Sequence, residues 1–286
     1  MFFMHNYIFN TFKHLTNNHT MKNLLLFLLV VPMVSFGQTK IGYGKQTSSY
    51  DVTVRDNSLA PAAQNNTELF PQKDLLIPYH SEWTKNHYKE RIEVFKNDPL
   101  NFNEIVFIGN SITEGGKNWS EKFNIPNIRN RGIGGDVTDG VLERLDEIIF
   151  FKPKAVFILI GINDLFNIYY KKQVPSPEYV GNNILKIART IKQNSPSTLI
   201  YVQTLLPTSK DFMKSNIEVV NKIIAADLPN DVFDIIDLNN FFSDDKGFLK
   251  KELTSDGTHL TEEGYALWVK IEKNIILSVH KTMPLN

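Results

Sequence analysis

The chain has 286 residues and contains no cysteine. This absence excludes disulfide bonds, zinc–thiolate sites, a cysteine nucleophile and a lipid-modified cysteine at a mature N-terminus. An excess of charge is also missing, because 31 Lys and Arg residues balance 31 Asp and Glu residues. A chain with no net charge and no long basic run gives no reason to expect nucleic acid or an anionic membrane surface as a partner.

Long hydrophobic runs are missing as well, since no apolar stretch reaches the roughly 20 residues that a membrane-spanning helix needs. Residues 21–38, "MKNLLLFLLVVPMVSFGQ", combine a lysine, a short apolar run and the small residues Ser35 and Gly37 just before Gln38. This is the pattern of a secretory signal peptide, although a buried helix or an uncleaved anchor would also contain such a run. We expect residues 1–37 to be an N-terminal extension and signal peptide, and the protein to be periplasmic or secreted, with no stable membrane anchor.

The region before residue 101 is interpreted as an N-terminal arm and helix, residues 38–100. Residues 39–78 are rich in Asn, Gln, Ser and Thr and show no sustained period, which favours an extended arm. Residues 80–98 then carry large apolar side chains at helical spacing: Trp83, Tyr88, Ile92 and Phe95. This spacing predicts a helix that packs on the outside of the following domain.

From residue 101 to 286, apolar runs alternate with amphipathic stretches. The apolar runs are rich in Val and Ile and cover residues 104–109, 155–160, 199–204 and 232–238, with a weaker run at 127–131. The amphipathic stretches have helical spacing and cover residues 137–150, 177–194, 215–228 and 261–281. Continuous apolar strands that alternate with helices are typical of a parallel sheet covered on both faces, so we predict an α/β domain.

Ligands of such sheets bind beyond the carboxyl ends of the strands, so the residues that follow each run are candidates for function. Ser111 follows the first run in "GNSITEGG", and Gly135 follows the weak second run in "RGIGGDVT". Asn163 follows the third run in "GIND", and Asp256 and His259 lie in "SDGTH" after the fifth. A glycine-rich phosphate loop of Walker type and a carboxylate–histidine metal cluster are both missing, so we expect no cofactor and no metal.

These residue types suit nucleophilic catalysis. A serine hydroxyl needs a base to take its proton, and a histidine base needs a third group that holds its tautomer and orientation. A developing oxyanion needs fixed donors, which glycine N–H groups and an Asn amide supply. Each piece also has a structural alternative: Ser111 and Asn163 as helix caps, the Asp256–His259 stretch as a turn that caps the last helix, and the double glycine as a tight turn. Their joint placement at one sheet edge favours catalysis.

The four blocks, in this order, resemble those of the GDSL or SGNH hydrolases, which are named for Ser, Gly, Asn and His. "RGIGGDVT" and "DGTHLTEEGY" most resemble bacterial relatives of the platelet-activating-factor acetylhydrolase catalytic subunits. The resemblance implies a flavodoxin-like three-layer sandwich with a central five-stranded parallel sheet. It implies that Ser111 is the nucleophile, His259 the base and Asp256 its orienting partner. The implied oxyanion hole consists of the Ser111 and Gly135 N–H groups and the Asn163 side-chain amide.

Two positions depart from related patterns. Asn110 stands where the family usually has Asp, so the turn keeps a hydrogen-bonding side chain and loses a charge. Thr113 stands where the Gly-x-Ser-x-Gly elbow of α/β-hydrolases needs glycine, so the chain does not match that fold.

We therefore expect an exported serine esterase that hydrolyses short-chain acyl esters, acetyl esters above all, on carbohydrates or similar polar alcohols. A lipid- or phospholipid-directed acylhydrolase and a non-catalytic glycan-binding module on the same fold are the alternatives. Aromatic side chains in the loops suit either sugar stacking or ordinary packing: Trp119, Phe166, Tyr169 and Tyr170. The sequence leaves the oligomeric state open.

The signal-peptide interpretation predicts a mature protein that begins near Gln38, because the small residues before it suit signal peptidase. N-terminal sequencing of the exported fraction checks this expectation. Recovery of intact Met1 or Met21 from that fraction would contradict it.

Overall fold

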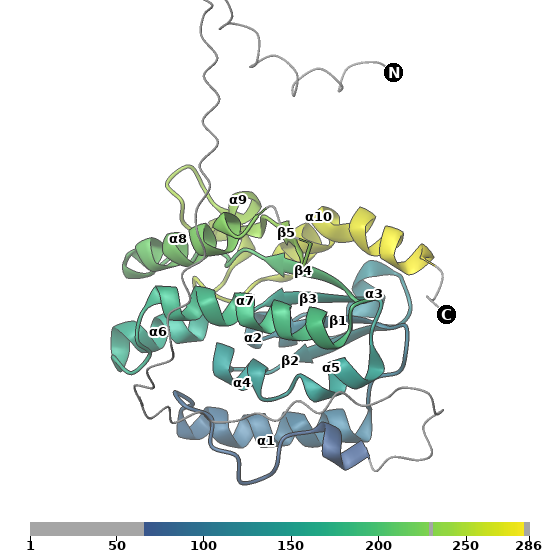
Figure 1. Cartoon of the computed structure of the whole chain (residues 1–286). Coiled ribbons are helices and arrows are strands. Elements are labelled where there is room, and N and C mark those ends of the chain that lie inside the picture. The colour runs from purple at the N-terminus through teal and green to yellow at the C-terminus, as the bar shows by residue number, and fades with distance from the viewer. Residues whose placement is uncertain (1–65, 229–230, 283–286) are drawn as a thin grey trace, which may run out of the picture. The chain divides into compact units, whose positions relative to one another are not determined.

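The computed structural model describes residues 66–228 and 231–282, so the expected signal peptide and most of the expected arm lie outside the described residues. The sheet is all-parallel and five-stranded, in the order β2-β1-β3-β4-β5 (Figure 1). Its strands are β1 (Ile105–Gly109), β2 (Ile128–Gly132), β3 (Ala155–Leu159), β4 (Leu199–Gln203) and β5 (Asp234–Ile236). The predicted α/β fold with a central five-stranded parallel sheet is confirmed.

Helices cover both faces of this sheet (Figure 1). The α-helices are α1 (Glu82–Asn97), α2 (Ser111–Glu114), α3 (Trp119–Phe123), α4 (Thr138–Leu142), α5 (Asp146–Phe151), α6 (Ile162–Tyr170), α7 (Pro177–Asn194), α8 (Asp211–Ala226), α9 (Leu238–Phe242) and α10 (Glu262–Lys281), with short 3₁₀ helices at Asn66–Leu69 and Lys251–Leu253. Helices α3 and α10 pack together, and α7 packs against α4, α5 and α8. Right-handed crossovers place these two groups on opposite faces.

The face under α3 and α10 has a continuous aromatic core. Phe107, Phe157 and Tyr201 are neighbours in register on three adjacent strands, and their rings stack at centroid distances of 4.8 and 4.7 Å. Trp119 of α3 stacks on Phe107 at 4.6 Å, and Trp268 of α10 meets Trp119 edge-on at 5.0 Å. Trp119 is fully buried, so packing and not sugar stacking explains this residue.

The predicted helix before the domain is confirmed as α1, whose cap Ser81 accepts the Thr84 N–H. Trp83 does not belong to its buried stripe, because its side chain is 62% exposed. Tyr88, Ile92 and Phe95 instead form a second hydrophobic cluster with residues of the loop that follows β2. Helix α1 therefore contacts the end of the sheet from which that loop departs. The domain boundary expected at residue 101 stays a prediction.

Residues 137–150 do not form the single helix expected from their spacing. They form α4 and α5, with a break around Arg144. The Arg144 side chain is buried and donates hydrogen bonds to the carbonyl oxygens of Gly109 and Arg131 and to the Asp136 carboxylate. These inward bonds account for the break, because an uninterrupted helix would carry the side chain elsewhere. Strand β5 is also shorter than the expected 232–238, since α9 begins at Leu238.

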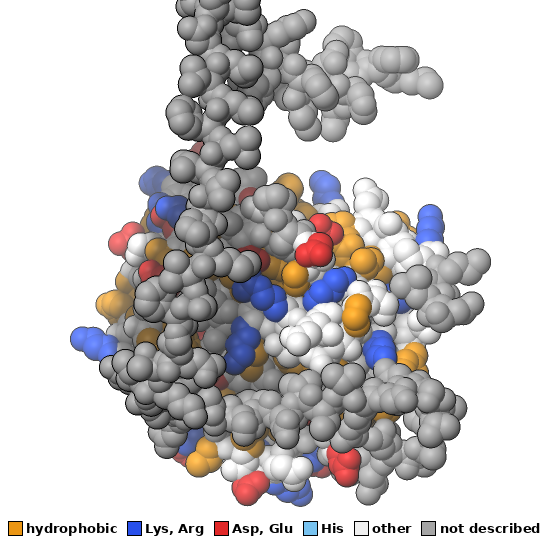
Figure 2. Space-filling model, in the orientation of Figure 1, with side chains coloured by type: hydrophobic (Ala, Val, Ile, Leu, Met, Phe, Trp, Pro, Cys, Tyr) orange, Lys and Arg blue, Asp and Glu red, His pale blue; other side chains and the backbone are white. Residues whose placement is uncertain are grey.

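On the face seen in Figure 2, basic and acidic side chains are interspersed. Within the described ranges, no helix is long and apolar enough to cross a bilayer. The same residues contain no group of three or more His, Asp or Glu side chains placed to hold a metal ion.

Glu272 of α10 is a fully buried acid in this core. Gln203 Nε2 donates to its Oε1 at 2.6 Å, whereas its Oε2 has no hydrogen-bond partner among the described residues. Burial raises the pKa of Glu272 to about 8, although the bond from Gln203 acts in the opposite direction. The side chain is therefore mainly protonated at neutral pH, because the loss of hydration on burial outweighs the interactions with Gln203 and Trp268 that favour the charged form.

This raised pKa predicts that stability falls as pH rises. The unfolded carboxyl titrates near 4.5, so between about pH 4.5 and pH 8 the folded state binds more protons than the unfolded state. The contribution of Glu272 to stability is then fully present below pH 4.5 and is lost as the pH rises through this window, at about 1.4 kcal/mol per unit of pKa difference. Glu272→Gln removes the titration, so its free energy of unfolding should vary less with pH. Urea unfolding at pH 5 and pH 8.5 measures this, with Glu263→Gln on the exposed face of α10 as control. Equal pH slopes in the wild type and Glu272→Gln would contradict the expectation.

Candidate active site

Ser111 lies at the first residue of α2, directly beyond β1. Asn110 caps this helix, because its Oδ1 accepts the Ile112 N–H at 3.0 Å. The alternative that Ser111 is the N-cap is therefore wrong, and the departure at Asn110 keeps a capping side chain. Gly109 is required before this turn, since a Cβ there would lie 2.2 Å from the Leu159 carbonyl oxygen. The Ser111 hydroxyl is left available for other contacts.

Ser111, His259 and Asp256 form one hydrogen-bonded chain. Ser111 Oγ lies 2.9 Å from His259 Nε2, and His259 Nδ1 lies 2.6 Å from Asp256 Oδ2. The other carboxylate oxygen, Asp256 Oδ1, accepts the N–H groups of Thr258 at 2.9 Å and His259 at 2.8 Å. The Asp256–His259 stretch is thus a turn, as the structural alternative required, but Thr261 and not Asp256 caps α10. The turn orients the imidazole toward the serine.

The Asp256 carboxylate is held in its charged form. Partial burial alone would raise its pKa, but hydrogen bonds from the His259 ring and from the two backbone N–H groups outweigh this and lower the pKa to about 2. The side chains of Asp256 and His259 are each 50% exposed, so this end of the site is open to solvent. An ionised Asp256 across the usual assay range favours the tautomer that carries its proton on His259 Nδ1 and presents Nε2 as acceptor.

Gly135 and Asn163 are linked by Asp136, the residue directly after Gly135, to whose carbonyl oxygen the Asn163 side chain donates a hydrogen bond. Gly135 has a φ of +76°, and a Cβ there would lie 2.5 Å from Thr84 Oγ1, so the position requires glycine. Asn163 Nδ2 donates to the Asp136 carbonyl oxygen at 2.9 Å, which leaves the second amide hydrogen available. Among the described residues, the N–H groups of Ser111 and Gly135 donate to no protein acceptor. Gly135 and Asn163 are partly exposed.

Asp164 does not cap its own helix α6, which begins after Gly161 without a side-chain cap. It instead accepts the Thr138 N–H at 3.1 Å and the Thr138 hydroxyl at 2.6 Å, at the start of α4. Burial raises the pKa of Asp164 to about 7, although the bonds from Thr138 oppose the rise. The contact ties the start of α4 to the start of α6, at the residue after Asn163.

Residues before the expected domain boundary reach the site, which the sequence did not indicate. His80 and His87 lie in the stretch that was expected to form a helix on the outside of the domain. His80 Nε2 lies 3.0 Å from Asp136 Oδ1, and His87 Nε2 lies 2.9 Å from Glu114 Oε2. These pairs are 56 and 27 residues apart in the chain, so helical periodicity carries no signal for them.

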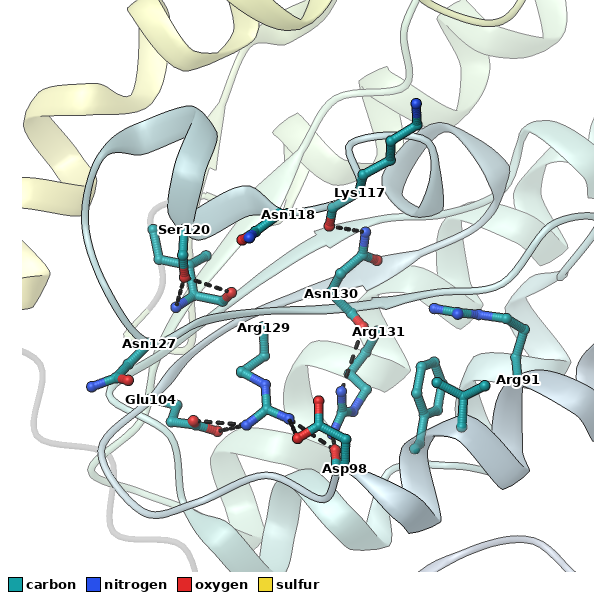
Figure 3. Close-up of a pocket in the computed structure, with 13 residues that line it drawn as sticks. Arg91, Asp98, Glu104, Lys117, Asn118, Ser120, Asn127, Arg129, Asn130 and Arg131 are labelled. Atoms are coloured by element: carbon teal, nitrogen blue, oxygen red, sulfur yellow. Dashed lines mark hydrogen bonds and ion pairs between the residues drawn. The ribbon is translucent and has the colours of Figure 1, made fainter.

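A pocket of about 170 Å³ adjoins the Gly135 and Asn163 donors. Its other lining residues come from the segment around α1, from the residue before α4, and from α6 and the residue after it: Tyr79, Ser81, Thr84, Val137, Phe166, Asn167, Tyr170 and Lys171. A separate pocket of about 570 Å³ runs along the edge strand β2 (Figure 3). Its arginines are paired, as in Arg129 with Glu104 at 2.8 Å, and it contains none of the predicted catalytic residues.

Comparison with known proteins agrees with this fold. The model of the GDSL-like lipase/acylhydrolase family matches residues 107–267. Human platelet-activating factor acetylhydrolase IB subunit alpha2 is 26% identical over 228 residues, which cover 77% of this chain and 94% of that protein. A solved GDSL-like lipase from Bacteroides thetaiotaomicron superposes with a TM-score of 0.58 at 24% identity, and the match covers 67% of this chain and 97% of that one. An acetyl xylan esterase superposes with a TM-score of 0.51 at 17% identity, covering 60% and 99%.

The all-parallel five-stranded sheet with its flanking helices defines a protein of the α/β class, and Ser111 lies just beyond the end of β1. This chain belongs to the GDSL-like lipase/acylhydrolase family. The resemblance inferred from the four sequence blocks is confirmed, and so is the expectation of an ester-hydrolysing enzyme.

Proposed function

We propose that the protein is a serine esterase in which Ser111, His259 and Asp256 act as nucleophile, base and orienting acid. The observation that carries the proposal is the chain of hydrogen bonds from Ser111 Oγ through both ring nitrogens of His259 to Asp256. This is the geometry that activates a serine: a base within hydrogen-bond reach and a third group that orients the base.

The reaction proceeds through an acyl-enzyme. Ser111 Oγ attacks the ester carbonyl carbon while His259 Nε2 takes the hydroxyl proton. The tetrahedral intermediate then breaks its bond to the alcohol oxygen, which receives the proton from the imidazolium. Water attacks the acyl-serine in the second half-reaction, with Nε2 again as base, and the acid product leaves as Ser111 regains its proton. Asp256 stays ionised throughout and stabilises the imidazolium.

The carbonyl oxygen gains negative charge in both half-reactions. The donors proposed for it are the N–H groups of Ser111 and Gly135 and the free amide hydrogen of Asn163. Each donor is held by other contacts: Ser111 by its place in α2, Gly135 by its packing against Thr84, and Asn163 by the Asp136 carbonyl. Fixed donors of this kind need no reorganisation when the charge develops, which is the largest electrostatic contribution in many enzymes.

The nucleophile assignment predicts that Ser111→Ala and His259→Ala each lower turnover of p-nitrophenyl acetate by about 10⁴- to 10⁶-fold, with the fold retained. Steady-state kinetics beside circular dichroism measures this. Ser215→Ala, on the exposed surface of α8, is the matched control and should keep full activity. Turnover of Ser111→Ala comparable to that of the control would overturn the assignment.

For the substrate, we propose short acyl groups, acetyl above all, on carbohydrate or similarly polar alcohols. The pocket beside Gly135 and Asn163 has a volume of about 170 Å³, below the roughly 300–1,000 Å³ of pockets that enclose drug-sized ligands. The curated relative reported above is named an acetylhydrolase. At the pocket rim, Tyr170 is 65% exposed and the adjacent Tyr169 is 50% exposed, so their rings can stack on a sugar. Export, as expected from residues 21–38, would bring the enzyme to acetylated polysaccharides.

This proposal predicts that activity falls as the acyl chain lengthens. A series of p-nitrophenyl esters from acetyl to octanoyl should give the highest kcat/KM for acetyl, since longer chains exceed the pocket. Acetate release from acetylated xylan and from O-acetylated sialic acid tests the alcohol side in parallel. Rates that rise toward octanoyl, with no acetate from either glycan, would favour the lipid-directed alternative. Binding of the glycans without acetate release, together with inactivity on every ester, would favour the non-catalytic module.

A further inference from the structure

Glu114 makes a contact that neither the triad nor the proposed oxyanion donors explain. It is the last residue of α2, one turn after Ser111, and its Oε2 accepts the Gly134 N–H at 2.5 Å. A carboxylate that accepts a backbone N–H forms a charge-assisted bond, roughly twice as strong as a neutral one. Gly134 directly precedes Gly135, whose N–H is a proposed oxyanion donor.

We propose that Glu114 is a positioning residue, which orients the Gly135 N–H toward the oxyanion by holding the Gly134 N–H, with α1 keeping the Glu114 carboxylate in place. This inference rests on the proposed function, because it concerns the donors of that same site.

The geometry of the peptide units around Gly135 explains how a hydrogen bond to the Gly134 N–H affects the direction of the Gly135 N–H. The N–H of Gly135 belongs to the peptide between Gly134 and Gly135. The preceding peptide is held at both ends, since its N–H donates to Glu114 and its carbonyl, from Ile133, accepts the Asp136 N–H at 3.1 Å. The same bond from Asp136 holds the following peptide. Two adjacent glycines would otherwise rotate with little restraint, so these bonds decide where the Gly135 N–H points.

The exposure of the loop after β2 agrees with a Gly135 N–H that is accessible and is held by its buried neighbours. Gly134 and Asp136 are buried, whereas Gly135 between them is partly accessible. The Asp136 carboxylate is anchored separately, by His80 at 3.0 Å and Arg144 at 2.9 Å. Glu114 therefore holds one side of the loop and this buried pair holds the other, and the accessible N–H lies between the two anchors.

Helix α1 in turn fixes Glu114. His87 Nε2 lies 2.9 Å from Glu114 Oε2, and Arg91 Nε lies 3.3 Å from Oε1. Trp83 stacks on the His87 ring at 4.8 Å, and an atom built at the Cβ position of Gly134 would lie 3.2 Å from Trp83 and 3.3 Å from His87. These side chains precede residue 107, where the family match begins. The Arg91 charge also offsets a carboxylate that would otherwise oppose the developing oxyanion.

A purely structural ion pair of this kind would have little effect on catalysis. The Glu114 side chain is 25% exposed and those of His87 and Arg91 are 22% and 20% exposed. Ion pairs near the protein surface contribute little to stability. Losing an oxyanion donor, in contrast, costs about 10²- to 10³-fold in kcat. The positioning role therefore predicts an effect on turnover out of proportion to any effect on stability.

The test compares Glu114→Ala and Glu114→Gln with Glu121→Ala and Glu121→Gln, an exposed acid on the neighbouring helix α3. Glu114→Ala should lower kcat for p-nitrophenyl acetate by about 10- to 100-fold with KM almost unchanged, because only transition-state binding is lost. Glu114→Gln keeps an oxygen acceptor for the Gly134 N–H and should restore kcat to within several-fold of the wild type. The Glu121 variants should match the wild type. Melting temperatures are measured for every variant.

His87→Ala supplies a second route if Glu114→Ala folds poorly. It should lower kcat several-fold, and its effect should be non-additive with that of Glu114→Gln, since both act on one carboxylate site. Unchanged kcat in Glu114→Ala, a change confined to KM, or additive effects in the double variant would overturn the positioning role. Those outcomes leave the proposed function intact as long as Ser111→Ala is inactive, whereas full activity in Ser111→Ala would refute the proposed function itself.

Discussion

The geometry of the site depends most on the hydrogen bonds of the buried Arg144 guanidinium. It bonds to the carbonyl of Gly109 at the end of β1, to the carbonyl of Arg131 in β2, and to the Asp136 carboxylate in the loop after β2. Its side chain is 4% exposed and that of Asp136 is fully buried. Removing one partner of such a pair leaves an uncompensated buried charge, at a cost of about 3–5 kcal/mol. One cation thus joins β1, which ends two residues before Ser111, to the loop that contains Gly135.

This arrangement separates the rigid part of the site from the accessible part. The loop after β2, which contains the proposed oxyanion donor Gly135, and the adjoining start of α4 are held by Arg144, His80, Asp164 and Glu114, three of which are buried and the last partly buried. The Asp256–His259 turn is instead half exposed and is held mainly by its own backbone bonds. Fixed dipoles are most effective when water is excluded from around them, whereas His259 in its proposed role as base would exchange protons with alcohol and water and so needs access to solvent. The two halves of the site meet these different needs.

The sequence was informative wherever a single element determines the outcome. Apolar runs located β1 and β3 to within a residue, and Ser111 and Asn163 lie just beyond these strands, at the starts of α2 and α6. Prediction from local spacing was less informative where contacts with residues distant in the chain determine the structure. The spacing of residues 137–150 indicated one helix, but Arg144 bonds to strand ends up to 35 residues away and interrupts it. For Trp119 the sequence left sugar stacking and ordinary packing both open, and the structure shows packing in a ring stack built from three strands and two helices.

Helix α1, which was expected to pack on the outside of the domain, also makes contacts with residues distant in the chain that the sequence did not reveal. Its apolar stripe is real and buries Tyr88, Ile92 and Phe95, so periodicity described its packing correctly. The polar residues between them have no period, and their partners become visible only in three dimensions: His80 at Asp136, Thr84 against Gly135, and His87 at Glu114. Each of these contacts meets the loop after β2 or the end of α2. The family match begins at residue 107, but the groups that fix the proposed oxyanion hole begin at residue 80, so in this chain the working site extends beyond the segment that the family model defines.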